Sequence, residues 1–224
     1  MSITVIIPTL NEASTIAETI RSLRLQQPGE IIVADGGSTD DTIKQAKEAD
    51  RVLIAPKGRA QQMNAGAAQA RGELLLFLHA DCRLEAGALA HAASLLAKPT
   101  VLAGCFSMSI EAGGWLYRLI EASAAARVRL TGLAYGDQGL FLRRSDFECL
   151  GGFPPLRFME DVFFSRRLRD HGRVILSAKK ILVSPRRWQH AGLIRQTLRN
   201  WTLTGLAAAG VHPDRLAHYY PSIR

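Results

Sequence analysis

Polar clusters follow three short apolar runs in the first half of the chain, and their side chains are of the types that hold cations and nucleotides. The clusters are Pro8-Thr-Leu-Asn-Glu12, Asp35-Gly-Gly-Ser-Thr-Asp40 and His79-Ala-Asp81. A carboxylate such as Asp81, placed after five apolar residues, needs a partner once its strand is buried, and a cation is the natural one. A fourth cluster, Glu160-Asp161, stands at the start of a predicted helix.

Each cluster also has a purely structural interpretation. Asn11 and Glu12 can start a helix, and Asp35 with two glycines can form a turn, since glycine adopts positive φ freely. Glu160 and Asp161 can complement the positive end of a helix dipole. These interpretations would all have to hold at once, so the set as a whole favours a functional site.

The elements that must position these clusters alternate between strand and helix over residues 1–100. The β-branched or apolar runs predict strands, and the runs with apolar residues at helical spacing predict helices. The predicted strands are Ile3–Ile7, Glu30–Ala34, Val52–Ala55 and Leu74–Leu78, and the predicted helices are Glu12–Leu25 (capped by Asn11), a segment from Ser38 or Thr39 through Glu48, and Ala60–Ala70. Near-continuous apolar strands separated by helices indicate a parallel sheet covered on both faces, with ligands at the carboxyl ends of its strands.

The second half of the chain is less regular. Its predicted strands are Val101–Ile110, Gly139–Arg143 and Ile181–Ser184, and its predicted helices are Gly113–Leu130, Glu160–His171 and Leu193–Ala209. No linker composition separates the two halves, so we expect one composite α/β domain.

Several protein classes are excluded or disfavoured by pattern. The sequence lacks GxxxxGK[ST] and has no GxGxxG after its first strand, which argues against a P-loop ATPase and a dinucleotide dehydrogenase. We see no secretory leader and no uncharged apolar run of about 18 residues. The three cysteines, Cys82, Cys105 and Cys149, are widely spaced, so neither disulfides nor zinc are expected. A cytoplasmic location is the default, with the inner face of the membrane as a further candidate.

The 224 residues carry 28 Lys and Arg against 20 Asp and Glu, a net charge of +8, and this charge is uneven. Residues 1–100 hold 10 cations against 11 anions, whereas residues 101–224 hold 18 against 9, and 16 of those 18 are arginine. Arginine makes forked contacts with phosphate and carboxylate. The excess therefore fits an anionic ligand, an anionic surface or nucleic acid.

Four ordered motifs resemble those of family 2 glycosyltransferases with the GT-A fold. They are Ile6-Ile-Pro-Thr-Leu-Asn-Glu12, Val33-Ala-Asp-Gly-Gly-Ser-Thr-Asp-Asp-Thr42, Gln62-Met-Asn-Ala-Gly66 and Phe77-Leu-His-Ala-Asp81. Gly136-Asp-Gln-Gly139, Gly151-Gly-Phe153 and Glu160-Asp161 look like acceptor-side motifs of that family, so the resemblance covers about the whole chain. The short form with Arg186-Arg-Trp188 looks most like the radical-SAM/selenodomain-associated subgroup.

The resemblance implies a single Rossmann-like GT-A domain over residues 1–224, with a mixed, mainly parallel sheet flanked by helices. Residues 1–100 would bind a nucleotide sugar, and residues 101–224 would bind the acceptor. The resemblance assigns donor binding, usually of a uridine nucleotide, to Pro8, Thr9, Asn11, Glu12, Asp35, Gly37, Ser38, Lys57, Arg59, Asn64, His79, Ala80 and Arg187. Lys57 and Arg59 precede a helix whose N–H groups suit a diphosphate, although a solvated surface is the alternative for both.

Asp81 corresponds to the last carboxylate of the family's DxD motif, which binds Mn²⁺ or Mg²⁺. Such a metal would bridge the diphosphate oxygens and stabilise the charge that develops on the leaving nucleotide. The sequence departs from the motif at its first position, His79. Histidine is a poorer ligand for Mg²⁺ than for Mn²⁺.

Asp161 matches the family's catalytic base, which would take the proton of an acceptor hydroxyl in an inverting displacement. Gly136, Asp137, Gln138, Glu160 and Trp188 are assigned to the acceptor side. Ser184 stands where processive members carry the Gln of QxxRW, which favours a non-processive enzyme. Arg187 would clamp the diphosphate, and Trp188 would either pack over the acceptor or belong to the core.

The predicted function is transfer of a sugar, a hexose carried by UDP, to an unidentified acceptor hydroxyl, and two alternatives stay open. One is a basic nucleic-acid-binding module, which the absence of an RNP, KH or helix-turn-helix signature disfavours. The other is a sugar-nucleotide-binding protein without catalysis. Arginines beside apolar residues in 115–130 and 193–209 suggest contact with an anionic membrane surface, or helices packed on the core with arginine outside. On this interpretation the excess arginine serves the diphosphate and an anionic acceptor, for which a lipid-linked molecule is a candidate.

Overall fold

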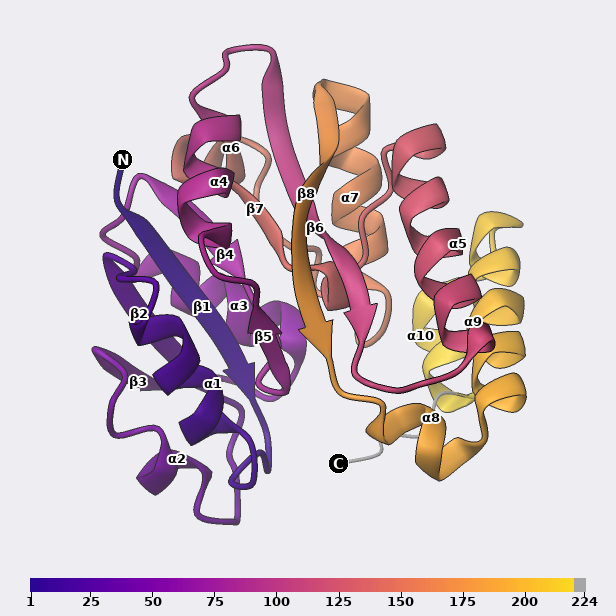
Figure 1. The fold of residues 1–224 in the computed structure, drawn as a ribbon, viewed down its shortest axis with the longest axis horizontal. Helices are drawn as coiled ribbons and strands as arrows, with labels where there is room; N and C mark the ends of the chain where they lie inside the picture. Colours follow the sequence, from indigo (N-terminus) through magenta and orange to yellow (C-terminus); the bar gives the residue numbers. More distant parts are fainter. Residues whose placement is uncertain (220–224) are drawn as a thin grey trace.

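The computed structural model describes residues 1–219, apart from the side chains of Arg187, His190, Ala191, Ile194 and Ala208. Within that range the chain forms one mixed sheet with helices on both faces (Figure 1). The strands are β1 (Ile3–Thr9), β2 (Glu30–Asp35), β3 (Arg51–Ile54), β4 (Leu74–Phe77), β5 (Cys82–Leu84), β6 (Val101–Ile110), β7 (Leu140–Arg143) and β8 (Arg173–Val183). The helices are α1 (Ile16–Arg24), α2 (Thr42–Gln45), α3 (Arg59–Ala68), α4 (Ala88–Leu96), α5 (Trp115–Thr131), α6 (Arg144–Cys149), α7 (Glu160–His171), α8 (Arg186–Ala191), α9 (Leu193–Ala208) and α10 (Pro213–Leu216).

The strand order is β3-β2-β1-β4-β7-β6-β8-β5 for the described residues. β3, β2, β1 and β4 are parallel, β7 runs antiparallel to both of its neighbours, and β5 is antiparallel to β8. This arrangement confirms the predicted mixed, mainly parallel α/β sheet.

Alternation along the central strands distributes the core between the two faces of the sheet. Val5 and Ile7 pack on the side of α1 and α4, whereas Ile6 packs on the side of α3, α6 and α7. In β2, Ile32 packs on the same side as Ile6, whereas Ile31 and Val33 pack on the other side of the sheet. Because successive side chains of a strand point to opposite faces, a continuous apolar run needs cover on both sides.

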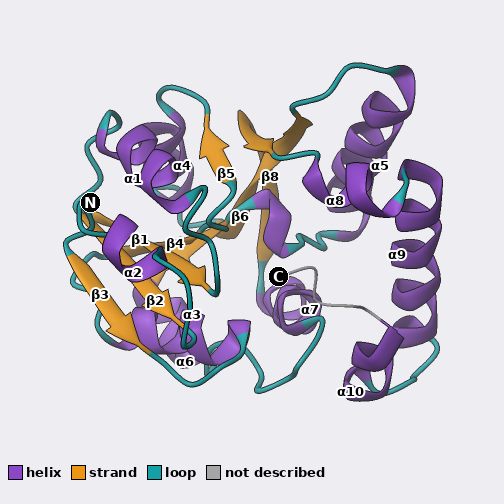
Figure 2. Ribbon diagram, turned by 90° about the horizontal axis from the view of Figure 1, so that it is seen from below, coloured by secondary structure: helices purple, strands orange, loops and turns teal. Residues whose placement is uncertain are grey.

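The C-terminal helices α8 and α9, together with α5, lie on the side of the sheet away from β3 (Figure 2). Met159 and Val162 at the start of α7 pack against Leu203 and Ala207 of α9 in a small separate apolar cluster. This cluster fixes α9 against the start of α7, and residues of α9 line one cavity together with His79 and Asp81, which follow β4. No helix within residues 1–219 is long and apolar enough to cross a membrane.

Several predicted boundaries were wrong for local physical reasons. The first helix begins at Ile16 rather than Glu12, because residues 11–15 form a turn in which Asn11 has φ 55°. The second helix is only Thr42–Gln45, and neither Ser38 nor Thr39 caps it. The predicted strand Ile181–Ser184 is the end of the much longer β8, whose first part is half-exposed and carries mixed polarity.

Candidate functional site

The carboxyl ends of β1 and β2 lie side by side, as the sequence predicted, with Thr9 opposite Asp35. The Asp35 carboxylate is fully buried. Its oxygens accept hydrogen bonds from Thr9 Oγ1 at 3.1 Å, from the amides of Gly37 and Ser38 at 2.9 and 2.7 Å, and from Ser38 Oγ at 2.5 Å. In this structure Asp35 therefore organises the loop at the end of β2, and Gly37 turns that loop outward with φ 90°.

A second set of hydrogen bonds ties this loop to the one after β1. The Asn11 amide N–H donates to Ser38 Oγ at 2.8 Å, and Asn11 Oδ1 accepts from the Thr39 amide at 2.9 Å. Asn11 thus links two loops and does not cap a helix, which corrects the sequence-based interpretation. Pro8 is buried beneath this link, whereas Asn11 and Gly37 are exposed at the surface.

Asp40 completes the same loop. Its carboxylate accepts from the Ala13 amide at 3.2 Å and from the amide and hydroxyl of Thr42. Desolvation would raise the pKa of Asp40, but these hydrogen bonds together outweigh it and lower that pKa below its ordinary value. The protein's own hydrogen bonds therefore hold the two loops together.

Arg186 bridges two of the predicted donor-side carboxylates. Its Nη2 lies 3.1 Å from Asp81 Oδ2 and 3.3 Å from Glu12 Oε2. Burial would lower the pKa of Arg186, but the hydrogen bonds and charges of Asp81 and Glu12 raise it, so the guanidinium stays charged. The sequence reasoning chose Arg187 as the cationic clamp; the Arg187 side chain lies outside the described residues, and Arg186 is the one that reaches the strand ends.

The residues at the end of β4 offer a small donor set for a divalent metal. His79 and Asp81 line one cavity, although the described residues contain no cluster of three His, Cys, Asp or Glu that would hold a metal alone. A metal that arrives with a diphosphate needs only one or two protein ligands, since phosphate oxygens supply others. Asp81 Oδ2 lies 3.1 Å from Arg186 Nη2, so the carboxylate is oriented toward a position where a positive charge can sit. Ala80, between His79 and Asp81 in the sequence, is buried, and its carbonyl accepts a hydrogen bond from Thr19 Oγ1 at 2.7 Å.

Arg59 and Glu160 form a buried ion pair between α3 and α7. Arg59 Nε lies 2.9 Å from Glu160 Oε1, and the two side chains are only 20% and 2% exposed. The predicted roles of Arg59 at the donor diphosphate and of Glu160 at the acceptor stay predictions, and in this structure the two side chains bind each other. Lys57, by contrast, is exposed on the preceding loop.

Two further predicted contacts are used inside the protein. Asn64, assigned to the donor, donates to the Phe153 carbonyl at 2.9 Å and accepts from the Phe153 amide at 3.0 Å. Gln138, assigned to the acceptor, is fully buried and accepts from Arg127 Nη2 at 2.5 Å. Both amides hold backbone or side chains of the second half in place, so neither presents itself to a ligand in this structure.

Asp161 stands at the start of α7 and is half-buried. Its Oδ2 accepts from the Gly136 amide at 2.5 Å, and its Oδ1 accepts from the Val162 amide at 2.8 Å. A methyl group at position 136 would come within 3.0 Å of both Asp161 Oδ2 and His79 Nε2. Gly136 therefore allows the end of β4 and the start of α7 to approach each other.

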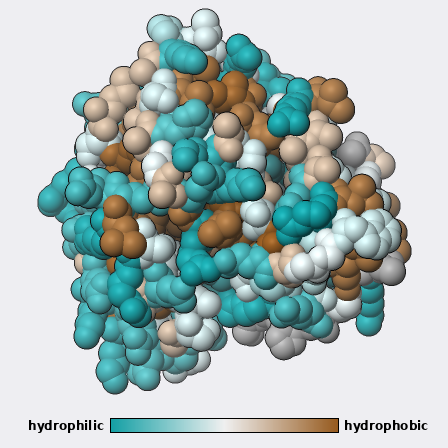
Figure 3. All heavy atoms as spheres, viewed as in Figure 1, coloured by the Kyte–Doolittle hydropathy of each residue, from teal (hydrophilic) through white to brown (hydrophobic). Residues whose placement is uncertain are grey.

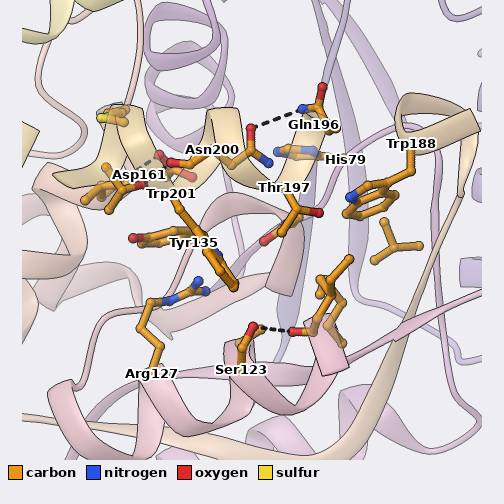
Figure 4. Close-up of a pocket in the computed structure, with 18 of the residues that line it drawn as sticks. His79, Ser123, Arg127, Tyr135, Asp161, Trp188, Gln196, Thr197, Asn200 and Trp201 are labelled. Carbon is orange, nitrogen blue, oxygen red and sulfur yellow. Dashed lines mark hydrogen bonds between the residues drawn. The ribbon is translucent and has the colours of Figure 1, made fainter. Parts of the chain in front are cut away.

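A cavity of about 390 Å³ lies between the strand ends and helices α5, α8 and α9 (Figure 4). It brings together six of the predicted residues and several that the sequence reasoning missed. The predicted ones are Arg59, His79, Asp81, Asp137, Asp161 and Trp188. The missed ones include Met108, Arg127, Tyr135, Gln196, Thr197, Asn200, Trp201 and Thr204. Those on α9 recur at positions i, i+1, i+4, i+5 and i+8, a helical stripe that the sequence could have revealed.

Trp188 belongs to the core, one of its two predicted alternatives, while its packing over an acceptor stays a prediction. The side chain is 8% exposed and belongs to the main core cluster, with its ring edge-on to Tyr117 at 6.3 Å between centroids. It also forms part of the cavity wall, where Figure 4 shows it near Thr197 and His79.

The fold and the site define a Rossmann-like α/β protein with a cavity where its strands end, the position at which such proteins bind nucleotides. Residues 4–159 match the family model described as glycosyl transferase family 2, and the chain belongs to that family. The narrower resemblance to the radical-SAM/selenodomain-associated subgroup stays a prediction.

Curated relatives align with part of the chain. A PGL/p-HBAD biosynthesis glycosyltransferase of Mycobacterium bovis is 38% identical over 103 residues, which is 41% of this chain and 40% of that protein. A protein of the same description from Mycobacterium tuberculosis matches to the same extent. The chain thus matches about two fifths of the length of these relatives.

Solved structures are similar over most of the chain. The mannosyltransferase PcManGT from Pyrobaculum calidifontis, in complex with GDP-Man and Mn²⁺, has a TM-score of 0.71 and 25% identity over 96% of this chain and 68% of that one. S. aureus TarS 1–349 in complex with UDP-GlcNAc has a TM-score of 0.67 and 22% identity over 82% of this chain and 58% of that one. Because TarS is only 22% identical to this chain, its similarity shows a shared fold and nothing more.

Proposed function

We propose that this chain is an inverting, non-processive glycosyltransferase that moves a sugar from a nucleotide diphosphate, UDP in the first instance, to an acceptor hydroxyl. One observation carries the proposal: the Asp161 carboxylate faces the same cavity as His79 and Asp81 at the end of β4. A base on one side and a diphosphate-facing group on the other are what a direct displacement at an anomeric carbon needs. Ser184, at the Gln position of the processive motif, supports non-processive transfer.

In this mechanism Asp161 accepts the proton of the acceptor hydroxyl as the new glycosidic bond forms. The amides of Gly136 and Val162 fix the orientation of its two oxygens. A carboxylate held in this way contributes about 10²–10⁴-fold as a general base. The residues of 1–100 would bind the donor, and those of 101–224 would shape the acceptor site.

On the donor side, the preformed loops after β1 and β2 would receive the nucleoside, with Asp35 acting through the shape of its loop. Arg186 would move its charge from Asp81 and Glu12 to the diphosphate. His79 and Asp81 would hold a divalent metal, Mn²⁺ or Mg²⁺, which supplies positive charge against the leaving nucleotide. Mn²⁺ accompanies the donor in the PcManGT complex, which supports this part of the proposal.

Peripheral contact with a membrane is a further part of the proposal. α5 and α9 lie side by side (Figures 1 and 2), and they expose large apolar side chains. These are Trp115 and Leu119 on α5 and Leu198, Trp201 and Leu206 on α9. Apolar surface appears on this side of the molecule in Figure 3. With the exposed Arg118 and Arg195 nearby, this face suits an anionic lipid surface. Pelleting with phosphatidylserine vesicles at low salt tests it, and a protein that stays in the supernatant contradicts it.

A thermal-shift screen of nucleotide sugars, with and without Mn²⁺, tests the proposed function. UDP-sugars and GDP-mannose form the first panel, and the matching free sugars form the control. We expect stabilisation by one nucleotide sugar, stronger with Mn²⁺, and none by the free sugar. If no nucleotide sugar stabilises the protein while random DNA retards it in a gel, the nucleic-acid-binding alternative is favoured instead.

A further inference from the structure

The cavity beside Asp161 has a largely apolar wall. β6, β8, α5 and α8 contribute Met108, Val183, Ile120, Ala124 and Trp188. Tyr135 and Trp201 add aromatic surface, and Trp201 is also 57% exposed, so the wall reaches the outside of the molecule at this residue. A volume of about 390 Å³ falls at the small end of the range for small-molecule pockets, and apolar walls with a few polar groups are typical of such sites.

The two guanidinium groups on this wall are already engaged by the protein. Arg59 pairs with Glu160 at 2.9 Å. Arg127 donates to Gln138 Oε1 at 2.5 Å and to the Leu133 carbonyl at 3.1 Å, and it lies over the Tyr135 ring at 3.4 Å from the centroid. Figure 4 shows this stacking of Arg127 beside Tyr135. Both guanidinium groups are thus oriented by contacts within the protein, and the charge of Arg59 is matched by that of Glu160.

Five charged residues line the cavity, the carboxylates of Asp81, Asp137 and Asp161 and the guanidinium groups of Arg59 and Arg127, so two positive and three negative groups give the lining a net charge of −1. Asp81 is also paired with Arg186 at 3.1 Å, which leaves Asp137 and Asp161 as the carboxylates that an acceptor would meet. A phosphate or carboxylate on the acceptor would come close to them in a site of restricted volume, where like charges repel more strongly than in water. The charge of the cavity therefore disfavours an anionic acceptor, although the second half of the chain is strongly basic overall.

Hydroxyl groups on the wall are set to accept hydrogen bonds. The hydroxyls of Ser123, Thr197 and Thr204 donate to the carbonyls of Ile120, Leu193 and Asn200, each at 2.8 Å. Each hydroxyl oxygen keeps lone pairs after this donation. A neutral ligand with its own hydroxyl groups can donate to them without bringing charge into the cavity.

We infer that the acceptor is an uncharged, amphipathic alcohol, whose aromatic or aliphatic body packs between α5 and α9 while its hydroxyl meets Asp161. This inference rests on the proposed function, because it names the acceptor of the same site. It replaces the expectation of an anionic acceptor that the charge of residues 101–224 suggested.

The first experiment uses a matched pair of probes on the unaltered protein, 4-nitrophenyl β-D-glucoside and 4-nitrophenyl β-D-glucuronide, which differ by one carboxylate. Two of the three tryptophans, Trp188 and Trp201, line the cavity, so nitrophenyl binding is read as quenching of intrinsic fluorescence. With the stabilising nucleotide present, we expect the glucoside to bind at least tenfold more tightly than the glucuronide. Equal or tighter binding of the glucuronide overturns the inference.

The second experiment fills the cavity and compares it with a change on the outside of the same helix. Ala124 lines the cavity and is buried, whereas Ala126 is exposed. Ala124→Phe should weaken glucoside binding at least tenfold, and Ala126→Phe should leave it within twofold of the parent. Unchanged binding in Ala124→Phe, in a variant that still shows nucleotide-sugar stabilisation, places the probe elsewhere and overturns the inference.

The two readouts separate the inference from the function on which it rests. Loss of every nucleotide-sugar shift in the unaltered protein defeats the proposed function. A clear nucleotide-sugar shift together with preference for the glucuronide defeats only the inference about the acceptor. If Ala124→Phe fails to fold, the probe pair on the unaltered protein still decides the question of charge.

Discussion

The loops after β1 and β2 and the helices α5 and α9 both border the candidate site, but different forces hold them. The loops are fixed by hydrogen bonds, with Asp35 and Asp40 each accepting several from residues nearby in sequence. α9 is fixed by apolar packing against Met159 and Val162 at the start of α7. Hydrogen-bonded loops need particular residue types at particular spacings, so they leave a motif in the sequence. Packing needs only apolar volume, and it leaves a much weaker trace.

The charges of the second half of the chain also differ from what the sequence suggested. The basic second half suggested an anionic partner, yet several of its arginines bind the protein's own carbonyls. Arg143 donates to the carbonyls of Leu96, Lys98 and Val101, and Arg167 donates to those of Leu150 and Gly152. Guanidinium groups satisfy buried backbone acceptors as well as external anions. Much of the excess charge is therefore structural.

The largest expected effect concerns Asp161, which lines the cavity bordered by α5 and α9. Asp161→Asn should fold normally, bind the nucleotide sugar and lose about 10²–10⁴-fold in transfer rate, because the amide cannot take the acceptor proton. Initial rates of nucleotide release with a working acceptor measure this loss. Asp170→Asn, on the exposed end of the same helix, is the control and should keep the parent rate. An Asp161→Asn variant with parental turnover would refute the assignment of the base.

The buried ion pair between α3 and α7 offers the next test, since it joins the two halves directly. Glu160→Gln leaves the Arg59 guanidinium with a neutral partner in a buried place, and it should cost about 3 kcal/mol of unfolding free energy. Urea denaturation measures the change. Glu148→Gln removes an exposed pair with Arg144 at 3.9 Å and should change stability by less than about 1 kcal/mol. Equal effects from both variants would mean that the halves are not held together at Glu160.

Arg186 connects the helical side of the site to the loop side. Arg186→Gln should weaken nucleotide-sugar binding about tenfold, because a charge-assisted hydrogen bond contributes about 1.5–3 kcal/mol. Isothermal titration calorimetry measures the affinity. Arg195→Gln, exposed on α9, should leave it unchanged. If both variants bind the donor like the parent, Arg186 serves only to neutralise Asp81 and Glu12.

The smallest expected effect concerns Asp50, which binds the amide of Ile31 at the start of β2, at the opposite end of this strand from the loop that Asp35 organises. Desolvation would raise the pKa of Asp50, but bonds and charge from Arg24 and the Ile31 amide lower it. A carboxyl whose pKa is lower in the folded state stabilises the protein above its unfolded pKa, and that stability is lost as pH falls through the folded pKa. Because Asp50 is 40% exposed, we expect Asp50→Asn to remove only about 0.5 kcal/mol at pH 7 and nothing at low pH. Denaturation midpoints at pH 7 and pH 3 measure the difference, and an equal loss at both values would contradict it.

Much of the fold could be predicted because the strands of the first half are apolar and their polar clusters are compact. The adjacency of Thr9 and Asp35 followed from this pattern. The helix α4 and the strand β5 were missed, and β8 was seen only at its end, since its first part alternates irregularly between polar and apolar residues. Asn64 and Gln138 matched family motifs but serve as internal links, because a motif records a residue type without showing which partner it contacts.

By itself, the sequence determined the parallel core of the sheet and the places where its strands end, since apolar runs and glycine-rich turns act locally. It also determined that the carboxylates Glu160 and Asp161 stand at the start of a helix. Only the tertiary structure decided that Arg186 reaches Asp81, that Arg59 is engaged by Glu160, and that α5 and α9 enclose a cavity with an apolar wall. These outcomes depend on contacts between residues far apart in the sequence, 105 positions for Arg186 and Asp81 and 174 for Arg186 and Glu12, which side-chain packing selects and local patterns do not encode.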